Sequence, residues 1–198
     1  MIFLVSIIVI FLIGVFLILP ISKRIRKKYT SGLDYLLGAF LLVAGIYLAQ
    51  KYSDNLNQEQ DKEKVISTIN RAILESNDVL QIVGGYASTI SKIKEPKDYY
   101  LIMKNNPLPS PVIFESFDRN PLIINNISDN TFQMFTRSKQ NLNTLRNWSQ
   151  DDELGISGIN KLIYGYLHEI DNVISCLNLE IKYINEEFDE ETHLELLK

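Results

Sequence analysis

Two long apolar runs stand at the start of the chain, and a short basic stretch separates them. The first run covers residues 2–19, and the second covers residues 33–49, in which Asp34 is the only charged residue. A helix of about 18 residues is roughly 27 Å long, close to the apolar thickness of a bilayer. The pattern predicts a transmembrane hairpin that occupies residues 1–50, with spans 2–19 and 33–49 joined by a loop at 20–32.

Five basic residues lie in the predicted loop: Lys23, Arg24, Arg26, Lys27 and Lys28. Cytoplasmic loops of membrane proteins are enriched in lysine and arginine, and such residues are attracted to anionic head groups. We therefore expect these residues to anchor the loop at the cytoplasmic membrane surface, with both termini outside the cytoplasm. A domain that faces the cytosol is the alternative. A cleaved signal peptide is disfavoured, because no basic residue precedes the first run.

Small residues recur in the second run. Gly38 and Gly45 are seven positions apart and share a helix face, and Gly45 and Ala49 form a small-xxx-small pair. Small residues allow helix backbones to approach closely in lipid. Two interpretations remain open, namely packing of the second span on the first and a face for oligomerisation or for a partner's helix.

A polar stretch at residues 51–64 follows and predicts a stalk or linker before a domain that covers residues 65–198. Apolar residues at spacings of three and four predict an amphipathic helix over 59–93. Residues 94–121 contain five prolines, which break long helices. We expect short helical turns there, whose aromatic side chains pack under the bundle; an exposed aromatic ligand site is the alternative.

The strongest helical pattern in the predicted domain comes last. After a helix at 129–149, capped by Ser128 or Asp129, apolar residues recur every seven positions between residues 156 and 188. Such a heptad seam packs within an antiparallel bundle or against a second copy of itself, and the polar Asn160 falls in one seam position. The seam consists of Ile156, Ile163, Leu167, Ile170, Ile174, Leu177, Ile181 and Ile184.

These elements predict an all-α fold, in which a transmembrane hairpin precedes an antiparallel helical bundle with a long heptad-patterned C-terminal helix. The segments 108–117 and 121–124, followed by Ile127 and Ser128 before a long helix, resemble uncharacterised prokaryotic membrane-anchored helical-bundle proteins. In those proteins a Leu-Pro segment and a short helix precede a helical hairpin. The resemblance implies a compact helical domain, and it implies no activity and no functional residue.

Composition and chemistry narrow the function further. The net charge is -4 and residues 186–191 are strongly acidic, which disfavours binding to a phosphate backbone. Cys176 is the single cysteine, so no internal disulfide forms. The two histidines, His168 and His193, are both expected on the last helix and too far apart to share a metal ion.

No catalytic motif, cofactor motif, metal site or small-molecule site emerges from the sequence. We therefore predict a non-enzymatic interaction or sensor protein without a cofactor, anchored as a multi-pass protein in a bacterial inner membrane with an extracytoplasmic domain. Its expected partners are the lipid bilayer and either a protein partner or another copy of the chain; nucleic acid is not expected. The alternative is an oligomerising membrane effector of phage defence or superinfection exclusion that perturbs the bilayer.

Overall fold

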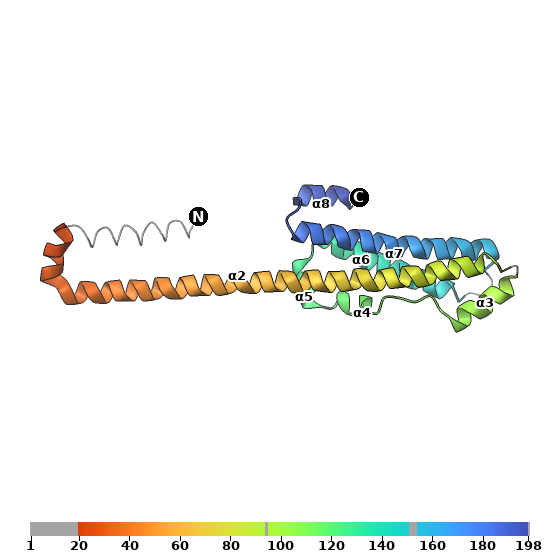
Figure 1. Cartoon of the computed structure of the whole chain (residues 1–198), viewed down its shortest axis with the longest axis horizontal. Helices are drawn as coiled ribbons and strands as arrows, with labels where there is room; N and C mark the ends of the chain where they lie inside the picture. Colours follow the sequence, from red (N-terminus) through yellow and green to blue (C-terminus); the bar gives the residue numbers. More distant parts are fainter. Residues whose placement is uncertain (1–19, 94, 151–153, 198) are drawn as a thin grey trace. The chain divides into compact units, whose positions relative to one another are not determined.

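The computed structural model describes residues 20–93, 95–150 and 154–197, and these residues form helices and no strand (Figure 1). The predicted all-α class is therefore confirmed for this part of the chain. The helices are α2 (Pro20–Ile90), α3 (Pro96–Asn105), α4 (Phe114–Phe117), α5 (Pro121–Asn126), α6 (Asp129–Trp148), α7 (Ile156–Ile184) and α8 (Glu190–Leu196).

The structure corrects the prediction of membrane spans. Over the residues that it describes, no helix combines the length and the apolar character needed to cross a bilayer. The second predicted span, 33–49, is a part of α2, which continues to Ile90. The predicted transmembrane hairpin is not supported, and the multi-pass inner-membrane location with both termini outside the cytoplasm is wrong. The first predicted span, 2–19, lies outside the described residues.

The physical reason is that the second apolar run does not form an element of its own. It lies within α2, which begins at Pro20 and continues through the polar residues 51–64 to Ile90. No glycine or proline interrupts the helix between residues 51 and 64.

The chain divides into two compact units, Met1–Asn57 and Gln58–Lys198. Helix α2 contributes to both units, and residues 51–64, predicted as a stalk or linker, are helical throughout. The absence of glycine and proline from this stretch explains why the helix is not interrupted there. All of the buried hydrophobic residues belong to the second unit, since the first of them along the described chain is Val65.

The core of the second unit is built from the C-terminal part of α2 together with α6 and α7. Helices α6 and α7 pack side by side as an antiparallel hairpin (Figure 1). The buried positions of α2 alternate in steps of four and three, which places them on one helix face. They are Val65, Ile69, Ala72, Ser76, Val79 and Val83, and Ile90 follows seven positions after Val83.

The short helices between Pro96 and Asn126 bring aromatic residues into this core. Tyr99, Phe114 and Phe117 are buried, as predicted for this proline-rich segment. The ring of Phe135 on α6 lies 4.9 Å from that of Phe114 and 4.5 Å from that of Phe117, measured between centroids. Such aromatic pairs stabilise a core beyond the area that they bury.

The C-terminal helix of the prediction is two helices in the structure. Helix α7 ends at Ile184 and not at residue 188, and Glu186 then adopts a positive φ of 60°. Asp189 is the N-cap of α8, where its side chain accepts a hydrogen bond from the Thr192 amide. The two histidines therefore lie on different helices, which corrects the expectation that both belong to one.

Candidate functional site

Glu180 on α7 is a fully buried carboxylate, with an exposed fraction of 0%. It accepts hydrogen bonds from Ser128 N at 2.7 Å, from Ser128 Oγ at 2.8 Å and from Thr131 Oγ1 at 2.6 Å. All three donors lie at the N-terminus of α6, where the helix dipole favours a negative charge. A buried charge is costly unless it is hydrogen-bonded, and these donors meet that requirement.

Ser128 makes hydrogen bonds with two helices. It is the N-cap of α6, as the sequence predicts, since its Oγ accepts a hydrogen bond from Thr131 N at 3.2 Å. The same hydroxyl donates to Glu180 of α7. The cap of one helix is thereby connected to a carboxylate on the next.

His193 on α8 covers the same carboxylate and is 1% exposed. Its Nε2 lies 3.2 Å from Glu180 Oε2. This is an ion-pair distance without hydrogen-bond geometry, because Nε2 has no hydrogen-bond partner in the described part of the chain. The imidazole also stacks on Tyr183, with ring centroids 4.6 Å apart, and on Phe188, with centroids 5.9 Å apart.

Cys176 lies one helical turn before Glu180 on α7 and is 3% exposed. Burial raises the pKa of its thiol to about 11; the negative charge of Glu180 also raises this pKa, while a hydrogen bond involving Thr131 lowers it. The thiolate is the nucleophilic form of cysteine. At neutral pH this thiol is therefore protonated and enclosed, which makes it a weak nucleophile.

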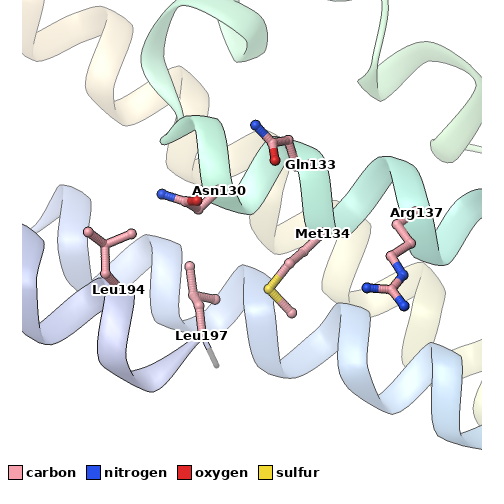
Figure 2. A pocket seen from close by; sticks show the side chains of 6 residues that line it. All are labelled: Asn130, Gln133, Met134, Arg137, Leu194 and Leu197. Atoms are coloured by element: carbon pink, nitrogen blue, oxygen red, sulfur yellow. The ribbon is translucent and has the colours of Figure 1, made fainter.

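A groove of about 250 Å³ lies between α6 and α8 (Figure 2). Three apolar side chains line it: Met134 of α6, Leu194 of α8 and Leu197, the C-cap of α8. The polar side chains along it come from α6 and are Asn130, Gln133 and Arg137. The volume is below the roughly 300–1,000 Å³ of typical small-molecule sites, so we treat the groove as an incomplete closure between two helices.

No group of three or more His, Cys, Asp or Glu side chains in the described residues is arranged to hold a metal ion. His168, which stands beside the predicted seam, is exposed on α7. Glu180 and His193 form an isolated pair, and their polar atoms face each other and the start of α6.

The predicted heptad seam lies mainly inside its own unit. Ile163, Ile170 and Leu177 are buried, and four more seam residues, Leu167, Ile174, Ile181 and Ile184, are half-buried against the core. Ile156 begins α7, and its side chain lies outside the described set. The predicted seam has a second row, at Asn160, Leu167, Ile174 and Ile181. In the structure the fully buried residues lie one position before each of these, at Ile159, Tyr166, Val173 and Glu180.

The small residues of the second apolar run lie on an exposed part of α2. Gly38, Gly45 and Ala49 are exposed, and a Cβ added at either glycine would meet no atom within 4 Å. No described residue therefore packs closely against this face. The predicted anchoring residues, Lys23, Arg24, Arg26, Lys27 and Lys28, belong to the first turns of α2, and their side chains lie outside the described set.

Large apolar side chains surround these small residues. Nine of them between residues 40 and 56 have exposed fractions from 38% to 68%. We call residues 38–56 the apolar segment of α2. The nine are Phe40, Leu41, Leu42, Val43, Ile46, Tyr47, Leu48, Tyr52 and Leu56.

Sequence reasoning did not find the Glu180–His193 pair. One signal was present, because Glu180 continues the buried spacing Ile170, Val173, Leu177 by a further three positions. A charged residue on an apolar helix face requires a partner. The identity of that partner depends on how α8 folds back on α7, which the local pattern does not contain.

The fold and this polar cluster define the protein as an all-helical bundle with a buried carboxylate between three of its helices. Comparisons of the chain with protein-family models, with curated proteins and with solved structures find no match.

Proposed function

We propose that this protein is a non-enzymatic helical interaction protein that self-associates through the apolar segment of α2. The observation that carries the proposal is the exposure of nine large apolar side chains within 17 consecutive residues of one helix. Contiguous exposed apolar surface of this kind is characteristic of interaction sites.

The spacing within the apolar segment favours another helix of the same kind as its partner. Positions 38, 42, 45, 49, 52 and 56 alternate in steps of four and three, the pattern of a coiled-coil seam. Gly38, Gly45 and Ala49 are small and Leu42, Tyr52 and Leu56 are large, so two copies can interlock large side chains over small ones. A second copy supplies this surface without any further component.

Charge favours an antiparallel arrangement of the two copies. The sequence carries five basic residues between positions 23 and 28, and the apolar segment begins ten positions after the last of them. A parallel pair would place these two clusters side by side, and like charges in contact oppose association. An antiparallel pair separates them and gives the two-fold symmetry that is commonest among homodimers.

The available burial is large enough for stable association. Full burial of one large apolar side chain contributes about 1.5–3 kcal/mol, whereas association costs about 4–15 kcal/mol in lost freedom. Three of the nine on each copy, Leu42, Tyr52 and Leu56, lie in this seam, so burial of these side chains on both copies gives a free energy of the same order as the cost.

Sedimentation equilibrium of the full chain tests the proposal with a matched pair of variants. Leu42 and Leu74 both lie on α2 and are 64% and 63% exposed, but only Leu42 belongs to the apolar segment. We expect a wild-type dimer, a dimer at least tenfold weaker for Leu42→Asp, and an unchanged dimer for Leu74→Asp.

Two outcomes would overturn self-association. One is a monomeric wild-type chain, and the other is an equal effect of Leu42→Asp and Leu74→Asp. A flotation assay with vesicles of phosphatidylethanolamine and phosphatidylglycerol tests whether lipid, and not a second copy of the chain, covers the apolar segment. Vesicle binding by a monomeric chain, lost in Leu42→Asp, would assign the segment to lipid and reject the proposal.

A further inference from the structure

We propose that α8 is a releasable C-terminal latch, which His193 holds closed over Glu180 and which uncovers one end of the α6–α7 hairpin when it opens. The proposal concerns only the second unit and does not depend on self-association through α2.

The attachment of α8 is sparse. Among the residues of Glu190–Leu196, only His193 is buried, while Leu194 is half-buried and Leu196 is 54% exposed. The groove between α8 and α6 shows that the two helices do not close on each other (Figure 2). Segments with few buried contacts open at a lower free energy than the core does.

His193, the one buried side chain of α8, makes three of the contacts that hold the latch. The imidazole of His193 faces Glu180 at 3.2 Å and stacks on Tyr183 and Phe188. Loss of this ring removes the contact with Glu180 and both stacking contacts together. The connection between α7 and α8, residues 185–189, is largely exposed and contributes little burial of its own.

The carboxylate beneath the latch does not need α8. Glu180 keeps its three hydrogen bonds from Ser128 and Thr131, both of α6, whether or not His193 is present. Opening therefore leaves no hydrogen-bonding group of Glu180 without a donor and admits water to a charge that water also stabilises. The hydrogen bonds that Glu180 makes within the α6–α7 hairpin are therefore kept when the latch opens.

Native-state hydrogen exchange of the full-length chain tests the latch. The amides of His193 and Leu197 donate to Asp189 O and His193 O within α8 and report its opening. We expect His193→Ala to accelerate exchange over residues 193–197 at least tenfold, with exchange in α6 and the first half of α7 unchanged. His168→Ala, at the exposed histidine of α7, is the matched control and should leave every rate unchanged.

A second variant acts on the latch without touching the buried pair. Asp189→Ala removes the N-cap of α8, where Asp189 Oδ1 accepts from Thr192 N at 2.9 Å. We expect about fivefold faster exchange over 193–197.

The latch is rejected if His193→Ala leaves exchange over 193–197 unchanged, or if it accelerates exchange in α6, α7 and α8 by one common factor. In the second case α8 is an integral part of the core. Should His193→Ala fail to fold, Asp189→Ala decides: selective acceleration in α8 supports the latch, and no acceleration overturns it.

Discussion

At the scale of single residues, the second unit places charge in its core and compensates it locally. Glu180 occupies a position that the helical spacing reserves for an apolar side chain, yet it is fully buried. The serine and threonine at the start of α6 supply donors, and His193 supplies a partner from α8. Side chains from α6, α7 and α8 therefore meet at this one buried group.

The thiol of Cys176 gives this region a measurable pH dependence. Burial raises its pKa from 9 to about 11, so the folded state holds the proton more tightly than the unfolded state does. The corresponding stability is fully present below pH 9 and is lost as the pH rises towards 11. We expect the free energy of unfolding to fall by up to about 3 kcal/mol over this range.

Urea denaturation at a series of pH values measures this loss, with Cys176→Ala as the control. The variant should lack the contribution that begins at pH 9 but retain a loss that begins near pH 10. The reason is that burial also raises the pKa values of Tyr99 and Tyr166 to about 12. Identical pH profiles for the two proteins would contradict the assignment.

At the scale of elements, helical periodicity predicts the helices well and their faces less well. The start of α6 and its Ser128 cap agree with the sequence prediction. The predicted apolar stripe of α7 is buried at Ile163, Ile170 and Leu177. In the second row of the seam, the buried residues lie one position earlier than predicted. Adjacent residues point about 100° apart around a helix. The orientation of α7 about its own axis, set by its packing on α6 and α2, therefore decides which of two adjacent residues is buried.

The turn between α7 and α8 offers a test at this scale. Glu186 has a φ of 60°, a left-handed conformation that costs an L-residue roughly 1–2 kcal/mol and that glycine adopts freely. We expect Glu186→Gly to raise the free energy of unfolding by about 0.5–1 kcal/mol.

Thermal and urea unfolding of the full chain measure the effect of Glu186→Gly. Glu187→Gly in the same turn is the control and should be neutral or destabilising, because the glycine adds freedom to the unfolded chain without relieving a positive φ. A loss of stability in Glu186→Gly larger than that in Glu187→Gly would contradict the expectation.

At the scale of the whole molecule, the burial of apolar side chains among the described residues is concentrated in the second unit. The buried hydrophobic residues of the described chain all lie after residue 58, whereas the described residues of the first unit expose theirs. A helix with an exposed apolar face gains little from its own chain and depends on what it contacts. The two units therefore have different roles, one as the folded core and the other as the proposed contact surface.

This division predicts that residues 58–198 fold without the first unit. We expect a fragment of residues 58–198 to remain helical and to unfold cooperatively, with a midpoint within a few degrees of the full chain by circular dichroism. A fragment of residues 74–198 is the control. It lacks Val65, Ile69 and Ala72 and should lose cooperative unfolding, because their removal leaves cavities in the core. Loss of cooperative folding in both fragments would show that the first unit is required.

The sequence by itself determined the all-α class, the extent of α6 and most of the apolar stripe on α7, because helix formation and amphipathicity are local and repeat along the chain. Only the tertiary structure decided that α7 stops at Ile184, that α8 returns over it, and that Ser128, Glu180 and His193 meet. It also decided that residues 33–49 belong to the longer helix α2. These outcomes depend on contacts between distant residues, and hydrophobic periodicity records that a face is buried without recording what buries it.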